Sequence, residues 1–375
     1  MALAATFAVL LIPQTARAAD FATWSKKMPI AFSGYTKSET LTNFPVLVTL
    51  STNTTGFSYT NFVYPADGAD LRFAASNQTD ELNYEIENWN TAGVSRVWVQ
   101  VPQVAGTNTL IYAFWGKSGV TAPPCTTNGS TWTNAFRGVW HMNGTNFVQR
   151  DSTTNGNNAS QVGGIVTGAV GIVDGAVHLD GSSGYLSVPN NAGISLTNNF
   201  TAEVWFKRDA ASAFDGFISK IPSIPGWTNG WCLNFNDNTD YFAAYFPVGY
   251  KDVDVGPSLN DTAWHHFVLR IQNGSFNLFF DGLQQSQNGV VGSLGSGEPL
   301  NFGRFATDAN SWNLLGLLDE IRYSAAPRST NWVWACWTNQ VSNSTFSVNG
   351  AVEDGQAVAA LDATGIGITN ATLNG

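Results

Sequence analysis

The chain has 375 residues and a formal net charge of −10 at pH 7, and only 12% of its residues are charged. This length fits two sandwich-sized domains better than one. The negative charge argues against a nucleic-acid partner and disfavours an anionic membrane surface. Hydrophobic residues make up 43% of the chain, enough for packed cores, and Asn, Thr, Ser and Gly replace charge as its polar component.

Residues 1–19 have the pattern of an export signal. An apolar run from Leu3 to Ile12 ends at Pro13, and Ala16-Arg17-Ala18 gives a small-x-small cleavage pattern. The run is too short to span a bilayer, and its start carries no positive charge. The alternative is a buried N-terminal strand or helix. We expect a periplasmic, cell-surface or secreted protein whose mature chain is not inserted in a membrane.

Residues 20–117 alternate in polarity, as expected for a β-sandwich. Residues 118–136 are rich in Gly, Pro, Thr and Ser, have no period, and are predicted to be an interdomain linker. The predicted strands of this first domain are Phe44 to Leu50, Ala69 to Phe73, Leu82 to Glu87, Val97 to Val101 and Thr109 to Trp115.

Strand patterns resume over residues 137–340. Asp281-Gly282 after an aromatic strand predicts a tight hairpin, and Ser329 predicts the N-cap of a helix that runs to Trp337. No βαβ alternation is present, so the fold class is all-β, with two β-sandwich domains in tandem. Strands are predicted at Val139–Met142, Ala176–Leu179, Tyr185–Val188, Phe200–Lys207, Cys232–Phe235, Trp264–Ile271, Phe276–Phe280 and Leu314–Tyr323.

The last 35 residues, 341–375, are weakly patterned. Ile366 to Leu373 is similar to the opening strands of a further β repeat, so we expect this tail to be the start of a truncated repeat. The three cysteines, Cys125, Cys232 and Cys336, are spaced too widely for a metal motif. A bridge between Cys125 and Cys336 stays open, although burial of Cys336 on its helix is the stronger expectation.

The second domain resembles the LamG-like, concanavalin A-like jelly-roll family. The resemblance rests on a set of fragments in a characteristic order, which together cover more than half the chain. The fragments are Gly138–Met142, Asp151-Ser152 with Asn155–Asn157, Gly175–Gly181, Phe200–Phe206, Trp264–His266, Phe279–Gly282 and Gly316–Tyr323.

The first domain is similar to an uncharacterised bacterial extracellular β-domain that often precedes such a jelly roll. The matching pieces include Asn43–Val48, Ala69–Phe73, Tyr84–Trp89 and Val97–Val99. That family has no established activity. The resemblance therefore implies a fold and an envelope-associated location, and no chemistry.

Several acids are candidates for chemistry. Glu85 and Glu87 share one face of a strand with carboxylates about 6–7 Å apart, a separation that overlaps the range used by glycosidases. The stronger expectation is a solvated strand edge or a structural pairing with Arg72 or Arg96. Asp319 and Glu320 are adjacent, so on a regular strand they point to opposite faces.

In calcium-binding jelly rolls, an aspartate on the closing strand helps to hold a structural ion. The resemblance therefore implies a Ca²⁺ site formed by Asp319 and Asp151, with the oxygens of Asn155 and Asn157 nearby. The alternative is that Asp151 caps a turn and Asp319 accepts backbone N–H bonds.

Aromatic residues in Gly/Asn/Asp-rich surroundings are candidates for ligand binding. Flat rings beside neutral polar side chains suit the CH faces and hydroxyls of sugars. The predicted ligand-binding residues are Trp227, Trp231, Tyr245 and Trp312, although most aromatic residues in a sandwich belong to the core.

We therefore expect a non-catalytic binding or adhesion protein that recognises glycans or cell-surface polymers through the jelly roll. One alternative is a structural spacer in a larger envelope protein. The other is a glycoside hydrolase, the one enzymatic alternative, which needs two facing carboxylates in the second domain. Glu203, on the same face as Trp205 and Lys207, is one acid without a partner. The sequence does not determine the oligomeric state.

Overall fold

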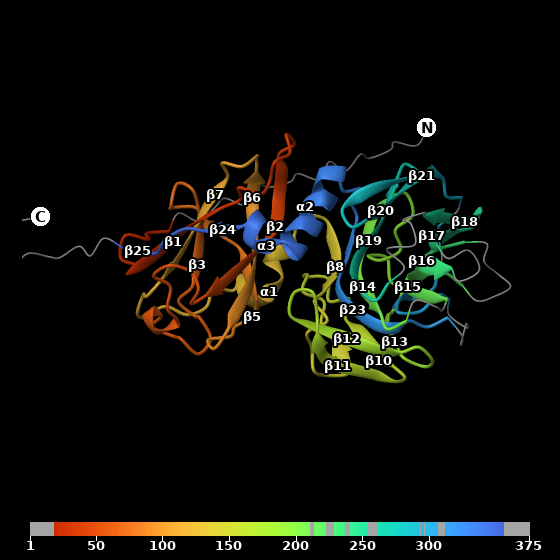
Figure 1. Cartoon of the computed structure of the whole chain (residues 1–375), viewed down its shortest axis with the longest axis horizontal. Helices are drawn as coiled ribbons and strands as arrows, with labels where there is room; N and C mark the ends of the chain where they lie inside the picture. Colours follow the sequence, from red (N-terminus) through yellow and green to blue (C-terminus); the bar gives the residue numbers. More distant parts are fainter. Residues whose placement is uncertain are drawn as a thin grey trace, which may run out of the picture.

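A computed structural model describes residues 19–355, except 211–213, 223–228, 237–240, 254–260, 293, 296 and 307–311. The N-terminal signal pattern, Trp227 and the predicted repeat at 366–373 lie outside the described residues. Two β-sandwiches lie side by side, with helices between them (Figure 1). The all-β fold class is confirmed, and so is the jelly roll in the second half. Among the described residues, no helix is both long enough and apolar enough to cross a membrane.

The first domain packs two antiparallel sheets over an aromatic core that includes Phe73, Tyr84 and Trp115. A short 3₁₀ helix, η1 (Tyr59–Asn61), follows the second strand. One sheet has the spatial order β24 (Val348–Asn349), β1 (Lys26–Ala31), β7 (Leu110–Trp115), β3 (Arg72–Ala75) and β4 (Glu81–Leu82), and β25 (Glu353–Asp354) also pairs with β1. The other has the order β2 (Leu41–Ser51), β6 (Val94–Val104) and β5 (Tyr84–Asn88).

The start of the predicted tail belongs to the first domain. Ile30 pairs with Asn349 in β24, and Lys26 pairs with Asp354 in β25. The chain thus returns from the jelly roll to complete the sheet in which it began. This differs from the expectation that residues 341–375 begin a separate repeat.

The second domain packs two eight-stranded antiparallel sheets face to face. We call them the helix-side sheet and the outer sheet. The helix-side sheet has the order β11 (Ile165–Val170), β12 (Gly175–Asp180), β23 (Leu315–Ser324), β14 (Asn199–Arg208), β19 (Trp264–Gln272), β20 (Ser275–Phe280) and β21 (Leu283–Val290), with β8 (Phe136–Trp140) paired to β23. The outer sheet has the order β18 (Gly249–Val253), β17 (Tyr241–Phe246), β16 (Trp231–Asn236), β15 (Asp215–Lys220), β22 (Leu300–Phe302), β13 (Tyr185–Val188), β10 (Ala159–Val162) and β9 (Val148–Gln149).

Because successive side chains of a strand point to opposite faces, every second residue of these strands points into the core between the two sheets. Val204 and Phe206 of β14 and Phe267 and Leu269 of β19 point into it. One irregularity matters for the site. Two residues of β23, Glu320 and Ile321, lie opposite one residue of β14, and Glu320 has a φ of +44°. This β-bulge shifts the alternation of side chains along β23.

The predicted linker is packed against both domains. It contains α1 (Cys125–Asn128) and the 3₁₀ helix η2 (Ser130–Trp132). The Trp132 side chain is 1% exposed and stacks edge-on against Phe136. Residues 118–136 therefore behave as part of the fold and not as a free linker.

Helix α2 (Thr330–Val341) lies between the two sandwiches, and α3 (Asn343–Phe346) follows it (Figure 1). The Ser329 hydroxyl accepts the Trp332 N–H, so the predicted N-cap is confirmed. One face of α2 places Val333 against Val268 and Phe279 of the helix-side sheet. The other side reaches the first domain, where the Asn339 side chain bonds the backbone N–H and C=O of Leu47.

Candidate functional site

The structure describes three of the four predicted ligand-binding residues, and of these only Tyr245 and Trp312 share a cluster. Trp227 lies outside the described residues. Trp231 is fully buried and packs against Phe200 and Tyr323, so its assignment to a ligand surface was wrong. It follows the alternation of β16, which points Trp231 and Leu233 into the core. Tyr245 and Trp312 are half-buried and remain candidates.

Tyr245 and Trp312 form the partly exposed rim of a small aromatic cluster outside the main core. Its buried members are Phe214, Ile221, Cys232, Phe305 and Ala306. The ring centroid of Phe305 is 5.2 Å from that of Trp312 and 6.0 Å from that of Tyr245. The two candidate rings therefore share one neighbour on the outer side of the outer sheet.

A row of small polar side chains crosses the outer sheet and ends at Tyr245. Directly paired residues of antiparallel strands share a face, and the alternate residues of these strands fill the core. The buried middle members, Ser219 and Asn301, have side-chain atoms without a hydrogen-bond partner. In spatial order the row is Ser160, Ser187, Asn301, Ser219, Cys232 and Tyr245.

An open hollow of about 230 Å³ lies at the Ser160 end of this row. Its lining carries no charge and consists of Gly156, Asn157, Asn158, Ser160, Val188, Pro189 and Asn191. The amide of Asn157 accepts from Asn191 Nδ2 at 2.8 Å and donates to the Arg137 carbonyl at 2.6 Å. The Asn158 oxygen accepts the Asp151 N–H at 2.9 Å, which leaves its NH₂ group for another acceptor.

The two predicted calcium ligands are occupied by backbone groups. Asp151 accepts the N–H groups of Val139, Thr153 and Asn157 and the Thr153 hydroxyl. Asp319 accepts the N–H groups of Ile172, Val173 and Glu320. No contact in the described residues joins the two carboxylates. Both aspartates thus have the backbone partners that were expected if they serve a turn and a strand and do not bind calcium. Asp151 also fixes the loop that forms the hollow.

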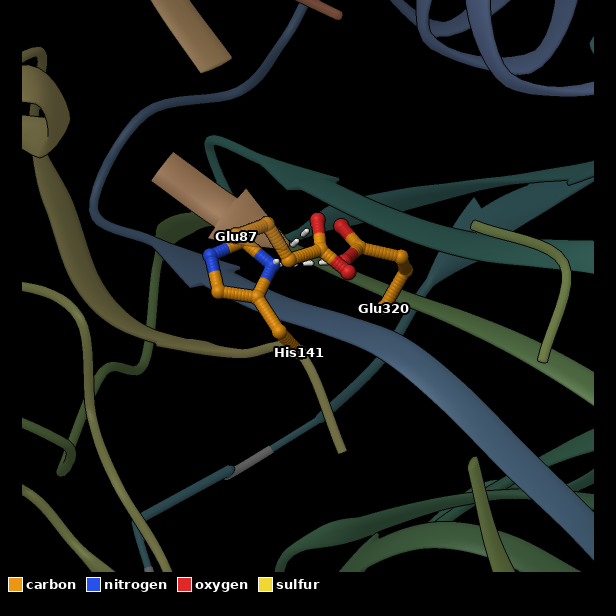
Figure 2. A group of neighbouring side chains, drawn as sticks. All are labelled: Glu87, His141 and Glu320. Carbon is orange, nitrogen blue, oxygen red and sulfur yellow. Dashed lines mark hydrogen bonds and ion pairs between the residues drawn. The ribbon is translucent and has the colours of Figure 1, made fainter. Parts of the chain in front are cut away.

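The most concentrated group of charges lies between the two domains. Glu87 comes from β5 of the first domain, His141 follows β8, and Glu320 comes from the β23 bulge (Figure 2). His141 Nδ1 is 2.5 Å from Glu320 Oε1 and 3.6 Å from Glu87 Oε2. The side chains of Glu87 and Glu320 are 0% exposed, and that of His141 is 4% exposed. We call these three residues the interdomain cluster.

Aromatic and charged neighbours enclose the interdomain cluster. Trp98 Nε1 donates to Glu87 at 2.5 Å, and Trp132 Nε1 donates to Glu85 at 2.5 Å. The imidazole of His141 stacks on Trp98, with an interplanar angle of 16°. Arg322 donates to Glu320 at 2.6 Å, and its guanidinium lies 4.4 Å from the Trp98 ring centroid.

The surroundings raise the pKa of some carboxyls in this region and lower the pKa of others. Burial raises the pKa of Glu87 well above its usual value, and repulsion from Glu320 adds to this effect. Burial and Glu320 also raise the pKa of Asp319. Burial acts in the same direction on Glu320, but attraction from His141 and Arg322 outweighs it and lowers the pKa of Glu320. Burial lowers the pKa of His141, but Glu320 and Glu87 outweigh it and raise that pKa well above 6.5.

Sequence reasoning had noted these acids but assigned their partners wrongly. Arg72 pairs with Glu81, and Arg96 pairs with Asp174. Asp319 and Glu320 do not point to opposite faces, because the bulge turns both away from a core that holds Leu318 and Ile321. His141 was not connected with the acids at all. The detectable signal was a histidine and several glutamates in otherwise apolar strands.

Glu87, His141 and Glu320 also have the donor types of a metal site, with ligand atoms within 4.8 Å of one another. Tetrahedral zinc ligands lie about 3.3 Å apart, given Zn–N and Zn–O distances near 2.0–2.1 Å. The 2.5 Å contact between His141 Nδ1 and Glu320 Oε1 is shorter and fits a charge-assisted hydrogen bond. Proton sharing explains this arrangement better than metal coordination.

Several solved structures match parts of this chain at low similarity. The binding domain of Paraclostridial Mosquitocidal Protein 1 is 13% identical with a TM-score of 0.44, over 54% of this chain and 52% of that one. Domain 4 of AbnA, an extracellular arabinanase from Geobacillus stearothermophilus in complex with arabinotriose, is 16% identical with a TM-score of 0.42, over 53% and 96%. A Trypanosoma rangeli sialidase is 11% identical with a TM-score of 0.45, over 69% and 43%. The match thus spans about half the length of the first of these chains.

No curated protein matches the chain significantly. Two family models match separate stretches of the chain. One stretch contains Glu87 of the interdomain cluster, and the other contains Glu320. Residues 180–333 match the family model of the concanavalin A-like lectin/glucanases superfamily, and residues 67–139 before them match a domain of unknown function (DUF2341).

Proposed function

We propose that the chain is an exported binding protein that recognises a neutral glycan or surface polymer through the outer sheet of its jelly roll. The observation that carries this proposal is the uncharged row across the outer sheet, which ends in an open amide-lined hollow at Ser160 and in Tyr245 at the other side. The match of residues 180–333 to a superfamily of lectins and glucanases supports the same class of ligand.

The hollow is suited to hydroxyl groups. Asn157 and Asn191 are held by bonds to each other and to the backbone, so little side-chain entropy is lost when a ligand binds. The NH₂ group of Asn158 and the hydroxyl of Ser160 are the donors that the fold leaves for a ligand. A charged ligand finds no opposite charge in this lining.

The rim formed by Tyr245 and Trp312 is a second contact region. The two ends of the row are five strand spacings apart, about 24 Å at 4.8 Å per spacing. The middle of the row is buried, since Ser219 and Asn301 are at most 1% exposed. A single glycan chain therefore cannot lie along the whole row. We therefore treat the hollow and the rim as separate contacts, each tested alone.

The test is a glycan-array screen of the mature chain, followed by titration of the best neutral ligand. Asn158→Ala removes donors worth about 1–2 kcal/mol and should weaken hollow binding roughly 5- to 30-fold. Trp312→Ala should weaken rim binding by about 1–3 kcal/mol if a sugar stacks there. Asn53→Ala, an exposed amide in the first domain, is the control that should change neither.

Two results would contradict the proposal. If wild-type protein binds no glycan or polymer, the structural spacer takes its place. If the purified chain hydrolyses a polysaccharide, the protein is a glycoside hydrolase. Glu203, the strand acid named from the sequence, is 1% exposed and faces His266 across 3.5 Å.

A further inference from the structure

The interdomain cluster and its charged neighbours contain more acids than bases. The acids are Glu85 and Glu87 on β5 and Asp319 and Glu320 on β23, and the bases are His141 and Arg322. With every group ionised, the net charge is −2 in a site shielded from water. A buried charge without a counter-charge costs several kcal/mol, so the site favours taking up protons.

Two positions can hold those protons. Glu87 Oε1 is buried and has no hydrogen-bond partner, while Glu87 Oε2 accepts from Trp98. Glu85 differs, because Trp132 and Ser152 donate to its two oxygens and favour its ionised form. Glu320 likewise has Arg322 on one oxygen and His141 on the other. Glu87 is therefore the carboxyl that stays protonated, and His141, which lies between Glu320 and Glu87, holds the other proton.

We propose that the contact between the two domains is a proton-dependent latch, closed while Glu87 and His141 hold their protons and loosened as the cluster loses them in alkaline solution. The latch is independent of glycan binding, because its residues lie on the opposite side of the jelly roll from the outer sheet. It joins β5 of the first domain to β23 of the second. Loosening of the latch would separate β5, which carries Glu87, from β23, which carries Glu320.

The sign of the pH dependence follows from the folded and unfolded states. The pKa of Glu87 rises from about 4.5 on folding, so the folded state binds more protons above pH 4.5 and stability falls as the pH increases. The pKa of His141 also rises, so its contribution is complete below pH 6.5 and is lost as the pH climbs through the folded value.

The ionised acids set the opposite limit. The pKa values of Glu85 and Glu320 are lowered on folding, because hydrogen bonds and neighbouring cations outweigh burial. Their contribution is present above pH 4.5 and is lost as the pH falls below it. The latch should therefore be tightest between about pH 4.5 and 6.5. Other titratable groups in range are Glu203 and Cys336, which act on Arg322.

The test uses the full chain and the variant Glu87→Gln, whose amide imitates a protonated carboxyl. We expect the wild-type melting temperature to fall between pH 6 and pH 9. Hydrogen exchange in β5 and β23, measured relative to the intrinsic exchange rate at each pH, should increase over the same range. Glu87→Gln should flatten this dependence and melt above wild type at pH 9. Glu353→Gln, a surface acid paired with Lys27, is the matched control and should keep the wild-type slope.

A second measurement avoids reliance on the variant. Infrared spectra of wild-type protein with ¹³C-labelled glutamate should show a protonated glutamic acid at pH 7. That band should disappear at the pH where exchange in β5 increases. A spectrum without the band, or a Glu87→Gln slope equal to that of wild type, would overturn the latch. Neither result depends on whether the protein binds a glycan.

Discussion

At the residue scale, Arg322 is the cation on which the interdomain cluster depends most. Its side chain is 1% exposed, and it donates to Glu320 while its guanidinium faces the rings of Trp98 and Trp132. These contacts combine an ion pair with cation–π attraction where solvent screening is weak. Shape and charge are therefore both lost when this side chain is replaced.

We predict that Arg322→Met destabilises the protein by about 3–5 kcal/mol at pH 7, because Glu320 then remains buried without its guanidinium partner. Chemical denaturation followed by tryptophan fluorescence measures this difference. Arg150→Met, an exposed arginine that donates to the Thr127 carbonyl, should change stability by less than about 1 kcal/mol. Equal effects of the two substitutions would count against a structural role for the buried charge.

Residue patterns predicted which side chains were unusual, but not where they point. Glu85, Glu87, Asp319 and Glu320 were all singled out in the sequence. Their orientation depends on two β-bulges, one between Ile86 and Asn88 and one at Glu320. A bulge changes the side-chain alternation without a composition signal, because Glu320 adopts its φ of +44° where glycine is the expected residue.

At the element scale, α2 acts as a shared layer between the sandwiches. The Asn339 side chain donates to the Leu47 carbonyl and accepts the Leu47 N–H at 2.7 Å. This pairing satisfies both backbone groups of Leu47 at a buried position in β2. The helix thereby takes the place of a neighbouring strand for one residue.

We predict that Asn339→Ala costs about 1–3 kcal/mol, since it leaves the buried N–H of Leu47 without a partner, while the Leu47 carbonyl keeps the bond from Asn343 Nδ2. Asn331→Ala, at a half-buried position of the same helix, is the matched control and should cost less than about 1 kcal/mol. Urea unfolding of both variants gives the comparison. Similar values for the two would indicate that helix propensity, and not the contact with Leu47, determines the effect.

Elements with local signals were predicted well. The Asp281-Gly282 turn joins β20 to β21 with both residues at positive φ, as the hairpin pattern requires. The helix was found from its N-cap, and β14, β19 and β23 from their alternation. Strands β24 and β25 were missed, because two-residue polar strands form only where β1 offers an edge.

At the scale of the whole molecule, the core of the first domain extends into the interdomain segments, while the jelly roll has a core of its own. The apolar cluster of the first domain includes Trp132 and Phe136 from the predicted linker and Trp332 and Phe346 from the helices. Removing residues 118–136 or 330–346 would therefore open the first domain as well as separate it from the second.

We predict a single cooperative thermal transition for the full chain, and resistance of residues 118–136 to limited proteolysis. A fragment of residues 20–117 should fail to fold, because it lacks β24, β25 and the aromatic residues that complete its core. Calorimetry and protease mapping provide the measurements. Two separate transitions with cleavage near Cys125 would show that the domains are independent.

The pairing of β1 with β25 also determines how the chain responds to mechanical tension. Lys26 lies beside Asp354 at one end of an antiparallel ladder, and Ile30 lies beside Asn349 further along it. A pull applied at residues 19 and 355 therefore loads this ladder one pair at a time, starting at Lys26, as a zipper is opened. The jelly roll lies between β1 and β24 along the chain, outside that line of force, and keeps its shape until the short ladder has separated. In a tethered protein, the return strands would serve as an early-yielding link that shields the jelly roll from load.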